Sequence, residues 1–281
     1  MAEKQRIAKL RWWDKVKGHH GFPASHVVYH FHPLAVIGNF GKMCSSKECD
    51  AEYYELEVNE GVIYRVSKET FKFILDTEAY AEYPYVPGSS NDQNSGITIG
   101  YGYDLGQQSE FTIRNNLSGI YAQSEIDRFV TVRGKRGDDA RTELNTVNNI
   151  SISRDNAMRL AMIMKRDYAK KVVAVYPQVV KYHPHCQGAM LSLVINRGNA
   201  LTASTTLAIA RRKEMKDIQT SFANGMPEEI PQLLRNMKVL WTPELPNNPR
   251  FITAYAGLVT RREKEAVFFE RGLTCICFSE K

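Results

Sequence analysis

The feature that most constrains the fold is a single stretch of turn- and strand-forming residues, Tyr83–Gly106, which separates one early helical segment from a long helical remainder. Pro84 disfavours helical backbone before it and cannot continue a helix. Pro-Gly and Asn-Ser-Gly sequences favour turns, and Ile97–Ile99 is predicted to be a short strand before a tight glycine turn. After Gly106 the pattern favours helices to the end of the chain. We therefore predict an α+β domain that is mostly helical, with a small β-hairpin region.

The early segment is predicted to be an amphipathic helix that begins after Ser67 and ends by Tyr83. The Ser67 hydroxyl can accept a hydrogen bond from an otherwise unpaired backbone N–H at the helix start. One apolar face follows at helical spacing, formed by Phe71, Ile74, Leu75 and Ala79. Glu78 is therefore expected in the last turns of this helix, beside apolar side chains and just before the hairpin region.

Helical periodicity predicts further helices downstream. A long helix over Asp155–Tyr176 should end before Pro177, and Ser124 and Ser153 are expected to be N-caps. Cys186–Asn196 is apolar and is predicted to be a central helix. The remaining predicted helices are Arg212–Ala223, Pro227–Leu240 and Pro249–Arg271.

Residues 1–60 differ in character from the rest. They are rich in aromatic residues and histidines and show no long helical period, so we expect an N-terminal extension or linker packed on a main domain over residues 61–281. Ser45–Gly61 is predicted to be loop with some turn. His30 and His32 would share one face of a short strand, where packing is the expected role, and no metal site is predicted.

The five cysteines leave three alternatives open. Cys44 and Cys49 could form a disulfide in an oxidising compartment. These two could also bind zinc with Cys275 and Cys277, although the spacing is not that of the usual zinc pairs. Free thiols are the third alternative. Cys186 begins an apolar helix and is expected in the core.

The formal net charge of +6 is compatible with several kinds of anionic partner. The basic residues are scattered, no nucleic-acid-binding motif is recognisable, and no apolar stretch is long enough to span a membrane. We expect neither nucleic-acid binding nor membrane insertion. The N-terminal sequence lacks the features of a secretory signal peptide, so the protein is expected to be made in the cytoplasm and to reach an external substrate by another route.

The functional prediction depends on Glu78. Hydrolysis of a glycosidic bond without a cofactor needs one protonated carboxylic acid and a second group that activates water or stabilises positive charge. A glutamate at a helix end among apolar neighbours suits the first role, because desolvation disfavours its charged form. A polar hairpin nearby suits the second role. Glu82, one helical turn later, is the rival acid.

Three sequence strings carry a resemblance to a known family. Glu78 is followed by Tyr85 and then by TIGYGYDLG over Thr98–Gly106. AMLSLVINRGNAL occupies Ala189–Leu201, and GLVTRREKEAVFF occupies Gly257–Phe269. Together these strings resemble the phage-type lysozymes, and more closely their pesticin-like branch, over about residues 66–271. The resemblance implies a muramidase that hydrolyses peptidoglycan between N-acetylmuramic acid and N-acetylglucosamine, without a cofactor or metal.

The resemblance also implies the roles of individual residues. Glu78 would be the general acid, Thr98 would help to hold the attacking water, and Asp104 would be the carboxylate that polarises this water. Attack from the face opposite the acid predicts an inverted product. Asp92 is the alternative second carboxylate, because phage-type lysozymes carry the aspartate ahead of the threonine.

Four further residues are candidates for substrate binding. Tyr101 and Tyr103 could stack on sugar rings or could lie in the core. Asn196 and Arg197 follow a predicted helix and could line the cleft, or form a helix C-cap with a surface cation. Trp241 is expected in the core. Helix-surface and interhelix ion pairs are expected for Arg261, Arg262, Glu263 and Glu265.

The N-terminal sequence WWDKV…FPASHVVYHFHP resembles the segment that joins lysozyme domains to delivery modules in bacterial type VI secretion effectors. This resemblance implies an antibacterial toxin that acts in the periplasm of a target bacterium. Its implied partners are peptidoglycan glycan strands, a cognate immunity protein and a carrier of the secretion apparatus. A phage endolysin or tail lysozyme, and a cell-wall-binding module without catalysis, are the alternatives.

Overall fold

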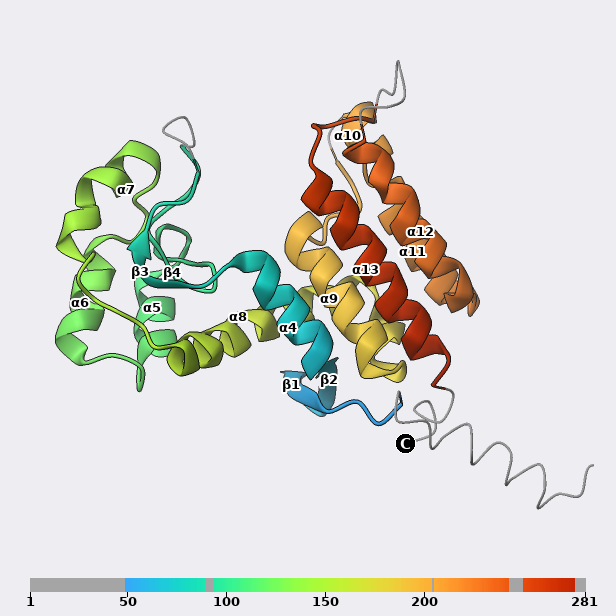
Figure 1. The fold of residues 1–281 in the computed structure, drawn as a ribbon, viewed down its shortest axis with the longest axis horizontal. Coiled ribbons are helices and arrows are strands. Elements are labelled where there is room, and N and C mark those ends of the chain that lie inside the picture. Colours follow the sequence, from blue (N-terminus) through green and yellow to red (C-terminus); the bar gives the residue numbers. More distant parts are fainter. Residues whose placement is uncertain (1–48, 89–92, 204, 243–249, 276–281) are drawn as a thin grey trace, which may run out of the picture. The chain divides into compact units, whose positions relative to one another are not determined.

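The computed structural model describes residues 49–88, 93–203, 205–242 and 250–275, whose elements are labelled in Figure 1. The strands are β1 (Tyr53–Asn59), β2 (Val62–Ser67), β3 (Ala81–Tyr85), β4 (Thr98–Gly100) and β5 (Tyr103–Asp104). The α-helices are α4 (Lys68–Glu78), α5 (Glu110–Leu117), α6 (Gln123–Thr131), α7 (Gly137–Glu143), α8 (Arg154–Val175), α9 (Pro184–Arg197), α10 (Thr206–Ala210), α11 (Lys213–Asn224), α12 (Ile230–Asn236) and α13 (Ala256–Leu273). The 3-10 helices are η1 (Leu105–Gln107), η2 (Leu144–Thr146), η3 (Pro177–Lys181), η4 (Pro227–Glu229) and η5 (Met237–Leu240). The strands form two small antiparallel sheets, β1–β2 and β3–β4–β5, so the predicted α+β class is confirmed.

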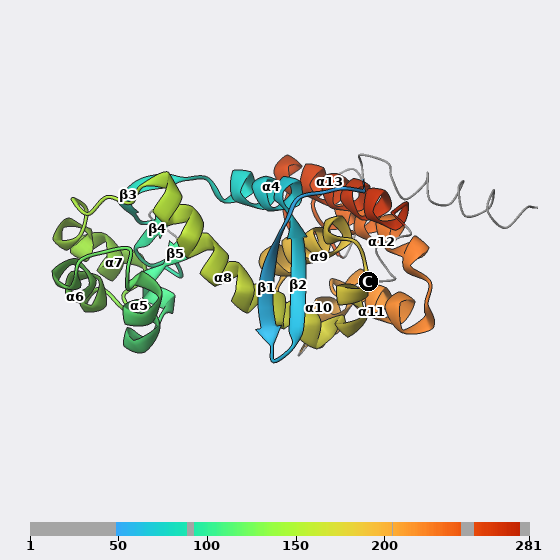
Figure 2. The ribbon, with the colours of Figure 1, turned by 90° about the horizontal axis from the view of Figure 1, so that it is seen from below.

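The β1–β2 hairpin spans residues 53–67 and therefore includes the boundary that was expected between the extension and the main domain, at residues 60–61. Strand β1 lies in the segment that was predicted to be loop, and this prediction is wrong. Leu56 and Val58 are buried at alternate positions, while the glutamates between and beside them face outward. Because the glutamates are typical of loops, the sequence pattern did not reveal this short strand. Figure 2 shows β1 beside β2, and both contribute to the same core as the later helices.

Buried apolar side chains of the described residues form two cores. The helical core contains residues of the β1–β2 hairpin, α4, α9, α11, α12 and α13. The sheet core contains residues of β4, β5, α5 and α6. Helix α8 contributes to both, with Leu160 in the sheet core and Val172 in the helical core. In Figures 1 and 2 this helix runs from the β3–β4–β5 sheet toward α9. Helix α4 thus belongs to the helical core and the β3–β4–β5 sheet to the sheet core, and α8 contributes to both cores.

Several predicted helix ends are confirmed, and others differ. Ser67 and Ser153 are N-caps, since their side chains accept hydrogen bonds from Thr70 N and Asn156 N. Ser124 is not a cap, because α6 begins at Gln123 and its capping carboxylate is that of Glu125. Helix α4 ends at Glu78, earlier than the limit set by Pro84, because residues 81–85 pair as strand β3. The predicted Pro227–Leu240 helix is divided into η4, α12 and η5, and α13 begins only at Ala256.

The described cysteines follow none of the three alternatives in full. Cys49 forms a disulfide with Cys275, with a Cα–Cα distance of 5.3 Å and a sequence separation of 226 residues. This pairing excludes the alternative of a Cys44–Cys49 bridge, and it also excludes Cys49 and Cys275 as zinc ligands or free thiols; Cys44 itself lies outside the described residues. Nearness in sequence could not reveal this partner, because it depends on where α13 ends. Cys186 is a buried free thiol in the helical core, as predicted.

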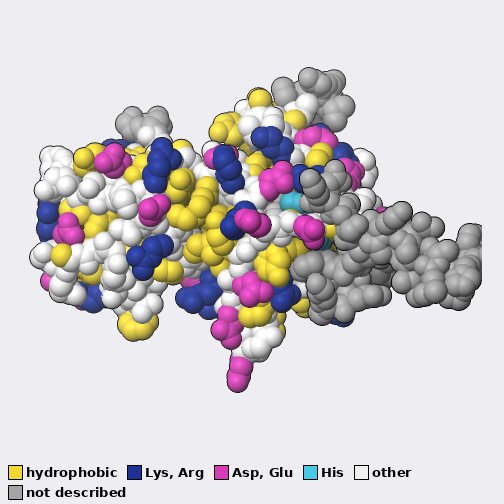
Figure 3. Space-filling view, turned by 60° about the horizontal axis from the view of Figure 1, so that its bottom comes forward, with side chains coloured by type: hydrophobic (Ala, Val, Ile, Leu, Met, Phe, Trp, Pro, Cys, Tyr) yellow, Lys and Arg dark blue, Asp and Glu magenta, His cyan; other side chains and the backbone are white. Residues whose placement is uncertain are grey.

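Charged residues occupy both the surface and the core. Figure 3 shows Lys and Arg side chains interspersed with Asp and Glu on one face. The ion pairs expected on α13 are present, but not all on the surface: Glu263 pairs with Arg235 of α12, whereas Arg261 and Arg262 pair with Glu265 at sites that are at most 7% exposed. Burial was missed because the α13 sequence carries charges on all sides. None of the described helices is long and apolar enough to cross a membrane.

Candidate active site

The C-terminal end of α4 positions Glu78. Glu78 is the last residue of this helix, and Ala79 ends it with a φ of +54°, a conformation that L-residues other than glycine seldom adopt. Ile74 and Leu75, in the preceding turn, are buried in the helical core. The Glu78 side chain is 20% exposed. A carboxylate is thus held at the edge of the core and still reaches solvent.

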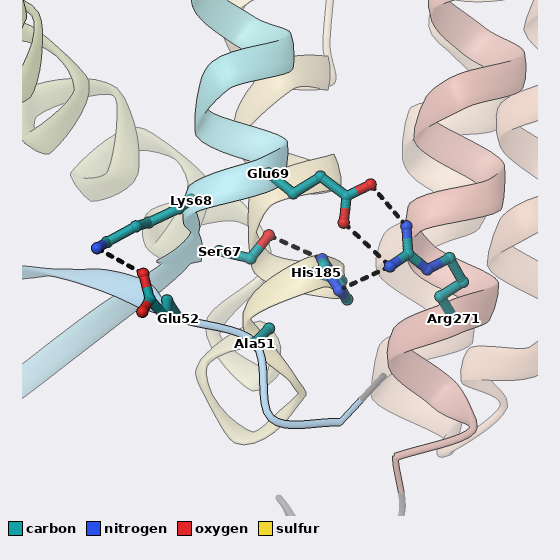
Figure 4. Close-up of a pocket in the computed structure, with 7 residues that line it drawn as sticks. All are labelled: Ala51, Glu52, Ser67, Lys68, Glu69, His185 and Arg271. Atoms are coloured by element: carbon teal, nitrogen blue, oxygen red, sulfur yellow. Dashed lines mark hydrogen bonds and ion pairs between the residues drawn. The ribbon is translucent and has the colours of Figure 1, made fainter. Parts of the chain in front are cut away.

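The other end of α4 is held by a polar cluster around a pocket of about 250 Å³, drawn in Figure 4. Ser67 Oγ lies 2.7 Å from Nδ1 of His185 on α9. Arg271 on α13 donates two hydrogen bonds to the Glu69 carboxylate, at 2.8 and 3.0 Å. Burial lowers the pKa of His185 to about 4, and repulsion from Arg271 and from the protonated form of His183 lowers it further. The cluster links α4 to α9 and α13, and these contacts hold the N-terminal end of the helix that carries Glu78.

Three polar side chains form a row across the β3–β4–β5 sheet. Tyr85 on β3 is opposite Thr98 on β4, and Thr98 is opposite Asp104 on β5. Directly opposed residues on antiparallel strands place their side chains on the same face. We call Tyr85, Thr98 and Asp104 the polar row. Ile99 and Tyr103, one position along, are buried on the other face in the sheet core.

The turn between β4 and β5 brings the sheet that carries the polar row up to Glu78. Gly102 has a φ of +84°, and a Cβ atom there would lie 2.8 Å from Glu78 Oε2. Glycine therefore lets the turn approach the carboxylate. Burial raises the pKa of Tyr85, and the negative charges of Glu78 and Asp104 raise it further. Both carboxylates thus lie near the Tyr85 phenol, and Glu78 together with the polar row forms the candidate site.

The Asp104 carboxylate is fixed by three donors. Its Oδ1 accepts from Gly106 N at 2.8 Å, and its Oδ2 accepts from Gly96 N at 3.2 Å and from Gln107 Nε2 at 2.8 Å. Thr98 is 2% exposed, and its hydroxyl donates to Gly96 O at 3.2 Å. Both side chains thus have one defined orientation, which a site that positions a water molecule requires.

A lysine that sequence reasoning missed faces Glu78 from helix α8. Lys165 Nζ lies 3.7 Å from Glu78 Oε2, and the Lys165 side chain is 1% exposed. Burial lowers the pKa of Lys165, while the Glu78 carboxylate opposes that change. The signal was available in the sequence, because Ala161, Lys165 and Ala169 are spaced four apart on the buried face of α8. A lysine on an apolar helix face calls for a partner.

The two candidate aromatic residues have different surroundings. Tyr103 is 1% exposed and its hydroxyl accepts from Asn116 Nδ2 at 3.3 Å, so a sugar ring cannot stack on it and its predicted binding role is corrected to a core role. Tyr101 is half-buried in the β4–β5 turn and packs on Tyr80, with ring centroids 5.5 Å apart. Alternation along a continuous strand would place Tyr101 and Tyr103 on one face, but Gly102, with a positive φ, forms a turn between them.

Asn196 and Arg197 lie in the last turn of α9, which ends at Gly198 with a φ of +70°. The Arg197 guanidinium donates to Arg211 O at 2.7 Å and lies 5.3 Å from the Trp241 ring. Burial lowers the pKa of Arg197 to about 10, together with the charges of neighbouring arginines. The contacts described for Arg197 therefore join it to Trp241, which is buried as predicted, rather than to Glu78.

Of the two alternative carboxylates, Glu82 lies within the described residues and Asp92 does not. Glu82 was expected one helical turn after Glu78, but it lies on strand β3 and is exposed. The expectation was wrong because the helix has already ended at Glu78. Asp92 lies outside the described residues.

A comparison with family models gives one match. The model of a family described as a bacterial toxin homologue of phage lysozyme, C-terminal part, matches residues 69–209, half of the 281-residue chain. The matched range contains Glu78, the polar row and Lys165. The predicted similarity of Gly257–Phe269 lies beyond it. No curated protein matches the chain significantly.

Proposed function

This chain belongs to the pesticin family of bacterial toxin homologues of phage lysozyme, and we propose that it is a muramidase that hydrolyses the bond between N-acetylmuramic acid and N-acetylglucosamine in peptidoglycan. The observation that carries this proposal is the approach of the β4–β5 turn to the Glu78 carboxylate, which brings an acid at a helix end together with the polar row. That arrangement supplies two carboxylates of different surroundings, as glycosidic hydrolysis requires.

Glu78 is the proposed general acid. Its proton passes to the glycosidic oxygen as the bond from that oxygen to the anomeric carbon breaks, and Glu78 is left as a carboxylate. A side chain that is 20% exposed can reach a bound glycan, while the buried neighbours on α4 keep most water away. Proton donation by a positioned acid contributes roughly 10²- to 10⁴-fold to the rate of such reactions.

Asp104 and Thr98 are the proposed water-activating pair. Because the Thr98 hydroxyl donates to Gly96 O, its oxygen can accept a hydrogen bond from water. Asp104, directly opposite on β5, is available to take a proton from that water as its oxygen attacks the anomeric carbon. Attack on the face opposite Glu78 would invert the anomeric centre, which proton NMR of the first-formed product can test.

The proposed biological role is that of an antibacterial effector delivered by type VI secretion into the periplasm of a target bacterium. A cognate immunity protein and a secretion carrier are the proposed partners. The support is the N-terminal resemblance given above, which lies in residues outside the described ranges. Expression in the periplasm, against expression in the cytoplasm of the same host, tests this role: lysis only in the first case is expected.

The activity itself is tested on isolated peptidoglycan sacculi. Wild type, Glu78→Gln, Asp104→Asn and Asp92→Asn are incubated with sacculi, and released fragments are analysed by mass spectrometry. Wild type should release muropeptides with reducing N-acetylmuramic acid ends, Asp92→Asn should remain active, and the other two should release almost none. Glu82→Gln is the matched control, because Glu82 is an exposed glutamate four residues from Glu78.

Each of the other outcomes has a defined meaning. Wild-type protein that binds sacculi and releases nothing would replace the enzyme with a wall-binding module. Loss of activity in Asp92→Asn, with Asp104→Asn active, would transfer the role of second carboxylate to Asp92. Full activity in Glu78→Gln would refute the proposed acid.

A further inference from the structure

Lys165 is a buried cation that faces the proposed acid. We propose that Lys165 is a positioning residue that sets the acidity of Glu78 and directs its carboxylate toward the β4–β5 turn. This inference rests on the proposed function, since it assigns a role in the same reaction. It concerns a residue outside the Glu78, Thr98 and Asp104 set.

The position of Lys165 argues against a purely structural role. It lies on the buried face of α8 between Ala161 and Ala169, where an apolar side chain would pack without loss of hydration. A buried ammonium group is costly unless it is paired. The ion pair described for Lys165 is with Glu78 Oε2, at 3.7 Å. A cation at such a site indicates that its charge is used there.

The groups around Glu78 and Lys165 come from four elements. Helix α8 contributes Lys165 and Tyr168, whose ring centroid lies 5.8 Å from Lys165 Nζ. Strand β3 contributes Tyr85, which also interacts with Asp104 on β5. Helix α13 contributes Arg261, which repels Lys165. Lys165 is the cation described in direct contact with the Glu78 carboxylate.

The Lys165 ammonium acts directly on proton transfer from Glu78. When Glu78 gives its proton to the leaving oxygen, negative charge develops on the carboxylate beside the Lys165 ammonium. The attraction between the two groups is absent in the protonated ground state and grows along the reaction. Lys165 would therefore lower the barrier to proton donation, and it would also hold the carboxylate in place between α8 and Gly102.

Removal of Lys165 should change the dependence of kcat/KM on pH in a defined direction. Without Lys165 the carboxylate loses a stabilising charge, so the pKa of Glu78 rises and Glu78 becomes a weaker acid. The alkaline limb of the profile of kcat/KM against pH, where the acid loses its proton, then moves upward. The plateau rate falls at the same time, because proton donation is less favourable.

The experiment measures kcat/KM against pH for the full chain and its Lys165→Met, Lys165→Arg and Lys170→Met variants. Lys165→Met should move the alkaline limb upward by about one to three pH units and lower the plateau by roughly tenfold or more. Lys165→Arg keeps the charge and should restore the wild-type limb. Lys170→Met, on the same helix but half exposed, is the matched control and should leave the profile unchanged.

A second measurement does not depend on activity. The ¹³C chemical shift of the Glu78 carboxyl carbon, assigned by its absence in Glu78→Gln, is titrated in wild type and Lys165→Met. A higher pKa in Lys165→Met supports the inference. An unchanged pKa and an unchanged pH limb, with only altered stability, would overturn it. If wild type hydrolyses no peptidoglycan, the proposed function fails, and the titration still decides whether Lys165 controls Glu78.

Discussion

The two ends of helix α4 have opposite characters. At the N-terminal end, Ser67 contacts Thr70 and His185, and the charged side chains around the pocket are paired with one another. At the C-terminal end, Glu78 has one ion pair at 3.7 Å and faces a glycine turn. The first end uses its polar groups to hold the helix, whereas the second leaves a carboxylate oriented and able to react. The proposed acid is thus positioned by a helix whose other end is held by paired polar side chains.

The largest effect should come from removing the reactive group. Glu78→Gln keeps the shape of the side chain but cannot donate a proton, so the rate of muropeptide release should fall by at least about a thousandfold. The midpoint of urea unfolding should also fall, because the variant leaves the buried Lys165 ammonium without its carboxylate partner. Wild-type specific activity in the folded fraction of this variant would show that Glu78, like Ser67, is mainly structural.

A smaller loss of activity should follow from filling the turn that faces Glu78. Gly102→Ala places a methyl group 2.8 Å from Glu78 Oε2 and forces a residue with a side chain to φ +84°. The carboxylate must move, and kcat/KM should fall by roughly 10- to 100-fold, since small misplacements of catalytic groups have effects of this size.

Gly119→Ala is the matched control for the turn variant. Gly119 has a similar φ of +76°, and a Cβ atom added there would have no neighbouring atom within 4 Å, so this variant isolates the backbone strain. Both variants should lose about 1 kcal/mol of stability. Only the Gly102 variant should lose activity, and equal losses in both would remove the argument for a close approach to Glu78.

At the other end of the helix, Ser67→Ala should cost stability and spare catalysis. The variant removes the cap and leaves Thr70 N and the buried His185 ring without their partner, which costs about 2 kcal/mol. Denaturant unfolding measures the loss, and the specific activity of the folded fraction should stay close to that of wild type. Ser153→Ala removes an exposed cap on α8 and should cost less, about 1 kcal/mol. A large drop in specific activity for Ser67→Ala would show that the two ends are not independent.

A pH dependence of stability is also expected at the Ser67 end. The pKa of His185 is lowered from 6.5 to about 4 in the folded chain, so the unfolded chain binds the proton more tightly. The contribution of His185 is fully present above about pH 6.5 and is lost progressively as the pH falls toward 4. Unfolding at pH 7.5 and at pH 4.5 measures the difference, which His185→Gln should reduce. An identical pH dependence in this variant would place the titrating group elsewhere, with His183 the next candidate.

Local interactions explain which parts of the molecule could be predicted from the sequence. The caps at Ser67 and Ser153, the apolar face before Glu78 and the glycine turn after Thr98 depend on residues a few positions apart. The fold class and the family follow from the same local patterns. The end of α4 was predicted less well, because Pro84 sets only a limit and the helix ends earlier to allow β3 to pair with β4.

What the sequence by itself determined about this protein is its elements and the chemical nature of its site: a glutamate at a helix end, a threonine and an aspartate beside a glycine turn. Tertiary structure decided which distant residues complete that site. Strand pairing aligned Tyr85 with Thr98 and Asp104, the packing of α8 on both cores brought Lys165 to Glu78, and the end of α13 gave Cys49 its partner. It also assigned Tyr103 to the core. The physical reason is that such contacts form only when separate elements bury their apolar faces together, and local sequence patterns contain no information on that arrangement.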